Sequence, residues 1–264
     1  MILSNDLPLL QKKKSQLMTS FKMKDLGEIH WFLGLEITRD RPWCLIFISQ
    51  SCYITEVMSH FGFSNSHPVS TPMASDLKLG LHSQPEPTVN TCKYQSCIGS
   101  VMYAMLGTHP DIGYAITKLS QYSSNPGEEH WMAINHLLCY LNSTKSLKLV
   151  YDGNSKDDNK SGYSDSDWAG NPRDHHSISG FVFTMAGRAI SWSSKKQPLV
   201  ALSSTEGEYM AMTHAAKEAI WIQRFLHDIH FPLPNCTTLL VDNQGAIALT
   251  SNPTFHMQMK HISV

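Results

Sequence analysis

Four acidic side chains stand at positions that suit metal-ion chemistry. Asp165 and Asp167 lie two residues apart at the end of a strand-like run, so both are expected on one face of that strand. Glu208 falls within a long helical pattern, and Asp242 follows the apolar run 239–241. Carboxylates that are fixed by strands and a helix can hold a divalent cation, because the scaffold sets the positions of their oxygens.

Glu208 begins an apolar stripe along its helix. The stripe continues through Met212, Ala215, Ala219, Ile222, Leu226 and Ile229. These steps of three and four residues place Glu208 on the face that packs on a sheet. An acid on such a face is costly unless it is paired or binds a cation. The structural alternative is a capping box between Thr205 and Glu208, although Ser203 and Glu206 can form the same box and leave Glu208 free.

The aspartates have structural alternatives as well. Asp165 and Asp167 fit a pair of solvent-facing turn acids, and Asp242 fits a helix N-cap. Three acids on neighbouring rigid elements, in the order strand, helix, strand, nevertheless favour a metal site.

The elements that would carry these acids follow from the hydrophobic pattern. Strands are expected at 163–167, 178–185, 189–193 and 237–242, and helices at 205–228 and 243–249. This βββαβα order predicts an α/β layer with a mixed sheet.

The first half of the chain has a more helical pattern. Helices are expected at 6–24, 51–61, 94–106, 112–122 and 128–141, and strands at 29–38 and 43–49 form a hairpin. A polar stretch at 152–161 then separates the halves. We therefore expect an α+β region at 1–151, a linker at 152–161 and a second domain at 162–264.

Composition narrows the class of protein. The 264 residues carry a net charge of −1, which counts against tight autonomous binding of nucleic acid but not against an enzyme that reaches its substrate through divalent cations. Six cysteines without a CxxC pair are typical of reduced thiols in the cytoplasm or nucleus. No apolar run is long enough to span a membrane, and no secretory signal is recognised, so a secreted protein is not expected.

Several longer segments carry a family signature. In the second half they are GYSDSDWAGNP (162–172), SGFVF (179–183), ISWSSKKQ (190–197), ALSSTEGEYMA (201–211), VDNQGAIALTSNP (241–253) and KHI (260–262). This half resembles the RNase H domain of copia-type LTR-retrotransposon Pol polyproteins. The first half contains FKMKDLGEIHWFLGLEI (21–37), YQSCIGSVMYAMLGTHPDIGYAI (94–116) and HWMAINHLLCYLNSTKSLKLVY (130–151), and it resembles the C-terminal part of the copia-type reverse transcriptase, with a thumb- and connection-like region.

The resemblance implies a chemistry. The family hydrolyses RNA in RNA/DNA hybrids with two Mg²⁺ ions, and Asp165, Glu208 and Asp242 match its first three metal-binding acids. Asp167 is a weaker candidate. Lys195 and Lys196 are candidate phosphate contacts, with a solvated turn as the alternative. Other parts of a Pol polyprotein are implied as partners.

Two departures from the family pattern bear on activity. Ser263 stands where the family has its fourth acid, so we expect the RNase H-like domain to be truncated at its C-terminus. The Tyr-Val-Asp-Asp polymerase motif does not occur in residues 1–150, so polymerisation by this chain alone is not expected. The alternative is a catalytically inactive retroelement remnant with no enzymatic role or only weak nucleic-acid binding. An integrase or transposase is disfavoured, because its glutamate follows both aspartates, whereas Glu208 lies between them.

Overall fold

The computed structural model describes residues 2–74, 77, 79–80, 89–155, 161–170, 174–231 and 237–251. Expectations about residues 156–160 of the linker and about Ser263 lie outside these ranges. The elements are α1 (Leu7–Ser20), β1 (Trp31–Phe32), β2 (Leu35–Asp40), β3 (Leu45–Ser49), α2 (Ser51–Phe61), α3 (Thr91–Gly107), the 3₁₀ helix η1 (Pro110–Ile112), α4 (Gly113–Ser120), α5 (Glu128–Thr144), β4 (Leu149–Asp152), β5 (Ser161–Asp167), β6 (Ile178–Met185), β7 (Arg188–Lys196), α6 (Ser204–Asp228), β8 (Thr238–Leu240) and α7 (Gln244–Ser251). Helices and two sheets agree with the predicted mixture of α and β structure.

The first sheet is antiparallel and has the order β1-β2-β3-β4. The predicted hairpin is confirmed, since β2 pairs with β3. The predicted strand at 29–38 is wrong as a single element, because the chain turns at Leu33 and Gly34, whose φ angles are 49° and 68°. The Tyr103 hydroxyl donates a hydrogen bond to the Leu33 carbonyl at 2.5 Å and holds this turn. Strand β4, which the hydrophobic pattern does not predict, joins β3 from about a hundred residues away.

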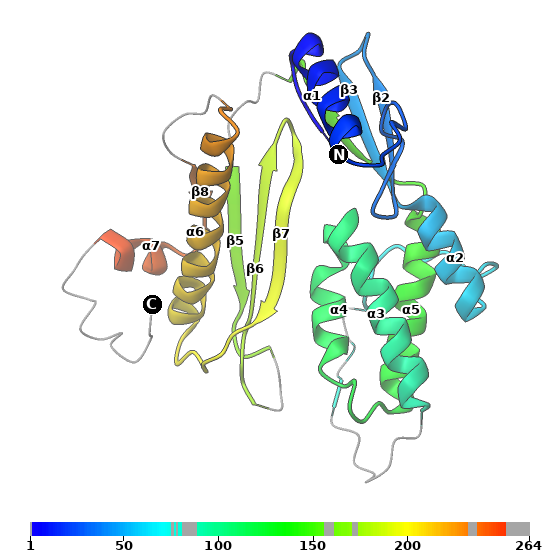
Figure 1. Ribbon diagram of the computed structural model, residues 1–264. Coiled ribbons are helices and arrows are strands. Elements are labelled where there is room, and N and C mark those ends of the chain that lie inside the picture. The colour runs from blue at the N-terminus through cyan, green and yellow to red at the C-terminus, as the bar shows by residue number, and fades with distance from the viewer. Residues whose placement is uncertain are drawn as a thin grey trace.

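Four helices, α2 to α5, form the larger hydrophobic core (Figure 1). Its fully buried side chains come from each of these helices and include Ile54, Met58, Tyr94, Ile116, Leu119, Ile134, Leu137, Leu138 and Leu141. Burial of so many large apolar groups is the main force that holds the helices together.

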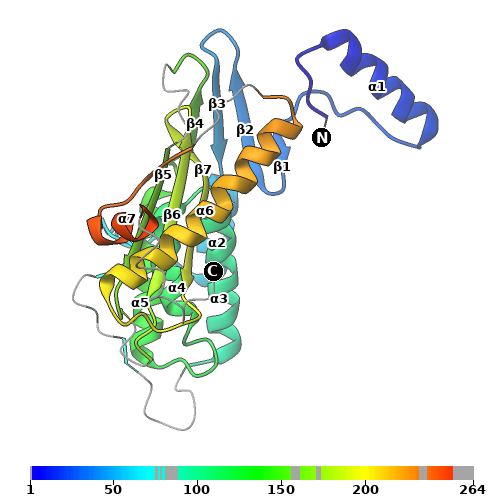
Figure 2. The ribbon, with the colours of Figure 1, turned by 90° about the vertical axis from the view of Figure 1, so that its left-hand side faces the viewer.

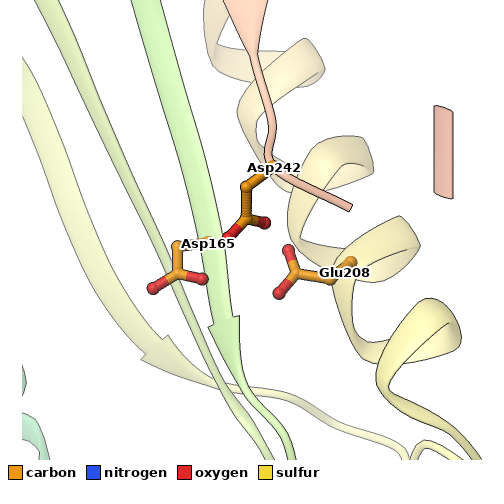
Figure 3. A group of neighbouring side chains, drawn as sticks. All are labelled: Asp165, Glu208 and Asp242. Carbon is orange, nitrogen blue, oxygen red and sulfur yellow. The ribbon is translucent and has the colours of Figure 1, made fainter. Parts of the chain in front are cut away.

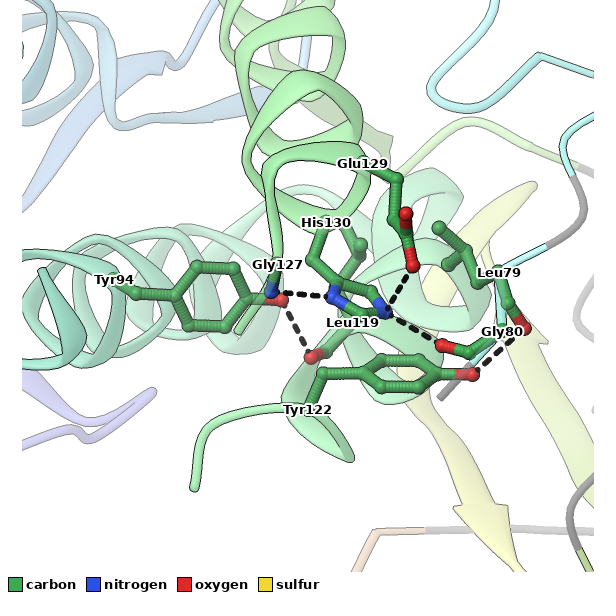
Figure 4. A network of polar contacts seen from close by, with 8 residues as sticks. All are labelled: Leu79, Gly80, Tyr94, Leu119, Tyr122, Gly127, Glu129 and His130. Carbon is green, nitrogen blue, oxygen red and sulfur yellow. Dashed lines mark hydrogen bonds and ion pairs between the residues drawn. The ribbon is translucent and has the colours of Figure 1, made fainter. Parts of the chain in front are cut away.

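A buried polar network lies beside this core, at the start of α5. His130 Nδ1 accepts a hydrogen bond from the Gly127 N–H at 2.8 Å (Figure 4). The ring proton is therefore on Nε2, which donates to the Gly80 carbonyl at 3.0 Å. The imidazole stacks on the Tyr122 ring with centroids 3.9 Å apart, and the Tyr122 hydroxyl donates to the Leu79 carbonyl. The network therefore fixes the segment that contains Leu79 and Gly80 against the start of α5.

The second sheet has the order β7-β6-β5-β8. Strands β5 and β8 are parallel, while the other pairs are antiparallel, so the predicted mixed sheet is confirmed. Helix α6 covers one face, where Phe181 and Phe183 pack against Ala215, Ile222 and Leu226. Helix α4 contacts β7 from the opposite side of the sheet (Figure 1).

Helix α1 extends away from the rest of the chain (Figure 2). It begins after Asp6, whose carboxylate accepts the Leu9 N–H, and it ends at Ser20, four residues before the predicted end. None of its residues is buried, and the side chains of Leu7, Leu9 and Met18 are exposed to solvent. Within the described ranges, no helix has both the length and the apolar character that a membrane crossing requires.

Candidate metal site

Strands β5 and β8 bring Asp165 and Asp242 to the same level of the sheet. Their parallel pairing joins Tyr163 to Leu240, and the same register continued for two residues sets Asp165 beside Asp242. The N-cap interpretation of Asp242 is wrong, because the Asn243 side chain accepts the Ala246 N–H at the start of α7. The Asp242 carboxylate is therefore not used as a cap.

Helix α6 presents Glu208 from its first turns. The Ser203 hydroxyl accepts the Glu206 N–H at 3.2 Å, and Glu206 in turn accepts the Leu202 N–H at 2.8 Å. The helix therefore begins with the Ser203 cap, and not with a box between Thr205 and Glu208. Glu208 is only 7% exposed, and it lies on the buried stripe with Ala211 and Ala215, as its position in the sequence predicts.

The three carboxylates point toward one another from β5, from α6 and from the segment that follows β8, which ends at Leu240 (Figure 3). Each of Asp165, Glu208 and Asp242 offers an oxygen, and these oxygens all lie within 4.8 Å of one another. Asp165 and Asp242 are exposed, whereas Glu208 is buried. The cluster is thus buried on its helix side and open to solvent on the other.

The cluster is electrostatically unfavourable without a counter-charge. Burial raises the pKa of Glu208 to about 7, and the negative charges of Asp165 and, to a smaller extent, Asp242 act in the same direction. The Ser166 N–H, which donates to Glu208 Oε1 at 3.2 Å, opposes this shift in pKa. Near neutral pH, Glu208 is therefore poised between its protonated and ionised forms.

The residues present fit a hard divalent cation. Glu208 Oε2 is buried and has no hydrogen-bond donor among the described residues. A buried carboxylate oxygen in that state needs either a proton or a cation. Three carboxylate oxygens are the kind of ligand that Mg²⁺ and Mn²⁺ prefer. Asp165, Glu208 and Asp242 are the residues that would hold such an ion.

Asp167 lies on the same strand but outside the cluster. Its Oδ1 accepts the Ile178 N–H, and its Oδ2 accepts the Tyr114 hydroxyl at 3.2 Å. Lys118 donates both to the Tyr114 hydroxyl and to the Gly170 carbonyl. Burial is the main cause of the raised pKa of Asp167. Its carboxylate joins α4 to the end of β5 and is not among the three that gather.

Lys195 and Lys196 belong to β7, which continues three residues beyond its predicted end. The solvated-turn alternative is therefore wrong. The Lys196 ammonium pairs with Asp174, whereas Lys195 is exposed. Of the two, Lys195 is the one that remains accessible to a phosphate.

Gln197 is a residue near the cluster whose position the sequence did not reveal. Its side chain is 4% exposed and reaches Ser166, Ser179 and Gly207. The segment 190–197 ends with this glutamine, but nothing in the local pattern indicates that a polar side chain directly after a strand is buried. Only the tertiary structure shows it.

Comparison with known proteins decides the family. The sequence profile described as reverse transcriptase (RNA-dependent DNA polymerase) matches residues 1–75. The whole chain is 42% identical, over 269 residues, to the retrovirus-related Pol polyprotein from transposon TNT 1-94 of Nicotiana tabacum. The chain belongs to the Pol polyprotein family of copia-type retrotransposons. It also aligns along its full length with the Pol polyprotein from transposon RE2 of Arabidopsis thaliana, at 36% identity.

This Pol-family chain corresponds to only part of those relatives. It spans 20% of the tobacco polyprotein and 18% of the Arabidopsis one. An uncharacterized mitochondrial protein of Arabidopsis thaliana is closer in size: it is 35% identical over 206 residues, which are 78% of this chain and 83% of that protein. No solved structure matches the chain.

Proposed function

We propose that residues 162–264 form an RNase H-like domain that hydrolyses the RNA strand of RNA/DNA hybrids with the help of Mg²⁺. The observation that carries this proposal is the convergence of Asp165, Glu208 and Asp242 within 4.8 Å on two strand ends and a helix. Membership in a Pol polyprotein family supports it, because such polyproteins act on nucleic acid. Residues 1–151 would then be the reverse-transcriptase part, and 152–161 the linker.

The chain's own residues would act mainly by position and charge. A divalent cation at such a site activates water and stabilises the charge that develops when a phosphodiester bond breaks. Asp165 provides an exposed oxygen from β5, and Asp242 provides one from the segment just after β8. Glu208 would bind the cation as its carboxylate, so binding displaces its proton, and metal affinity rises with pH through about 7.

A non-catalytic nucleic-acid-binding protein is the second candidate. The observation that favours it is that three carboxylates, not four, gather in the part of the chain that the structure describes. Two-metal hydrolysis in this family uses four acids, and a three-acid cluster can hold a single cation without completing that geometry.

Cleavage of a labelled RNA/DNA hybrid in Mg²⁺ and in Mn²⁺ separates the two candidates. RNase H function predicts metal-dependent cleavage of the RNA strand that disappears in Asp165→Asn and persists in Asp167→Asn after correction for stability. Binding of the hybrid without cleavage in either metal would contradict the proposal and support the second candidate.

A further inference from the structure

Gln197 is a buried amide whose side chain contacts the chain neighbours of two members of the acid cluster. It follows directly after β7, and its N–H donates to the Ser177 carbonyl at 2.8 Å. Its Nε2 lies 3.1 Å from Ser166 Oγ and 2.9 Å from the Gly207 carbonyl. Ser166 is the neighbour of Asp165, and Gly207 is the neighbour of Glu208.

The amide therefore joins the elements that carry those acids. Besides β5 and α6, it reaches β6 through Ser179 Oγ at 2.9 Å. Strand β5 and helix α6 approach each other closely at this point: a Cβ on Gly207 would lie 3.3 Å from Ser166 Oγ. A hydrogen bond between buried groups is expensive to remove, since the group left behind stays dehydrated and unpaired.

The chemistry of the contacts requires an amide at this position. The Gly207 carbonyl can only accept a hydrogen bond, so the NH₂ group of Gln197 must face it. The serine hydroxyls accept from the same NH₂ group, whose two hydrogens are shared among the three acceptors, and Oε1 has no hydrogen-bond partner among the described residues. A carboxylate of the same size would set its oxygen against the Gly207 carbonyl and would add a fourth negative charge beside the cluster.

We propose that Gln197 is a positioning residue for the metal site and that it sets the distance between Glu208 on α6 and Asp165 on β5. This inference rests on the proposed function, because it assumes that the three carboxylates bind a divalent cation. Gln197 itself does not contact the ion. It acts through Ser166 and Gly207, whose backbones carry the neighbouring acids.

Mn²⁺ affinity, measured by electron paramagnetic resonance, tests the proposal directly. Gln197→Leu is expected to weaken Mn²⁺ binding by about tenfold, the size of effect seen when a residue that orients a metal ligand is removed. The same variant should raise the Mg²⁺ concentration for half-maximal cleavage without changing KM for the hybrid. Should Gln197→Leu fail to fold, Ser179→Ala removes one of the three contacts and is expected to give a smaller loss of affinity.

Gln50→Leu is the matched control. Gln50 is also a buried glutamine, 2% exposed, and its amide donates to the Tyr103 carbonyl and accepts the Thr108 hydroxyl. These hydrogen bonds involve none of the residues next to the three acids, so the variant should lower the Tm but leave Mn²⁺ affinity unchanged. A folded Gln197→Leu protein with wild-type Mn²⁺ affinity would overturn the positioning role alone. Wild-type protein that binds no Mn²⁺, or binds it independently of Asp165, would overturn the proposed function as well.

Discussion

The Ser166 backbone N–H donates to Glu208 Oε1 at 3.2 Å, and this hydrogen bond ties strand β5 to helix α6 inside the acid cluster. One oxygen of Glu208 is thereby satisfied, while Oε2 is buried without a donor among the described residues. One carboxylate oxygen holds the side chain in place through its hydrogen bond, and the other oxygen lacks a hydrogen bond. This asymmetry makes the charge state of Glu208 depend on what else enters the site.

In metal-free solution, Glu208→Gln should be more stable than wild type at alkaline pH. The pKa of Glu208 is about 7 in the folded protein and 4.5 ordinarily, so the folded state binds the proton more tightly. The protonated Glu208 side chain therefore contributes its full share of wild-type stability below about pH 4.5, and this contribution is lost as pH rises through about 7. A glutamine can still accept the Ser166 N–H and can donate to Asp165. Thermal unfolding in EDTA between pH 5 and pH 8 measures the difference.

Adding Mg²⁺ should reverse that order. The cation stabilises only a protein that can bind it in the folded state, so wild type should gain in Tm at pH 8, and Glu208→Gln should not. Equal responses of the two proteins to Mg²⁺ would contradict the assignment of Glu208 as a ligand.

Removing either aspartate charge should lower the pKa of Glu208, and the two effects should differ in size. Asp165 raises this pKa more than Asp242 does, so Asp165→Asn should produce the larger drop. Carbon-13 NMR titration of the glutamate carboxyls, with Glu208→Gln for assignment, measures each pKa. The expected order is wild type highest, Asp242→Asn intermediate and Asp165→Asn lowest; any other order would contradict the described geometry.

Much of the site could be predicted from the sequence, because its acids obey local rules. The period of the helix placed Glu208 on the buried stripe, and Ser203 with Glu206 gave the cap that leaves it free. The apolar run before Asp242 predicted a strand. The part that could not be predicted depends on contacts between distant segments: neither the burial of Gln197 nor the use of Asp167 by Tyr114 has a local signal.

In the fold as well, features with a local sequence pattern could be predicted, and features that depend on distant contacts could not. Periodicity and turn residues located most helices and the β2–β3 hairpin. The turn at Leu33 depends on a hydrogen bond from the Tyr103 hydroxyl, seventy residues away. Residues 149–152 form strand β4 because their backbone pairs with β3. Long-range pairing of this kind is decided by tertiary packing, which propensity does not report.

Gly162→Ala should destabilise the second sheet. A Cβ at this position would lie 2.9 Å from Phe183 Cδ1 and 3.0 Å from Leu239 Cδ1, and the Phe183 ring is 1% exposed and cannot move aside freely. Overpacking of this type costs about 1–3 kcal/mol of unfolding free energy. Urea unfolding measures the loss.

Gly99→Ala provides the contrast for that experiment. Gly99 is an exposed position in helix α3, and a Cβ there would meet nothing within 4 Å. Alanine is expected to stabilise this helix by up to about 1 kcal/mol. A gain in stability for Gly162→Ala as well would show that the sheet is packed less tightly than described.

Tyr114→Phe should weaken the attachment of α4 to the end of β5. The variant loses the hydrogen bond to Asp167 Oδ2, at a cost of about 1 kcal/mol, and the pKa of Asp167 should rise further because a donor to its ionised form is gone. Thr117→Val is the control, since Thr117 on the same helix bonds the Ser194 carbonyl instead. It should cost similar stability and leave the pKa of Asp167 unchanged; an equal pKa shift in both variants would contradict this account.

The central claim is that Asp165, Glu208 and Asp242 together bind a divalent cation, and anomalous diffraction from crystals grown with Mn²⁺ above neutral pH tests it most directly. The account predicts a manganese peak in contact with an oxygen of each of the three carboxylates, and its loss in Asp165→Asn crystals. Intact carboxylates in the same arrangement with no manganese between them would contradict it.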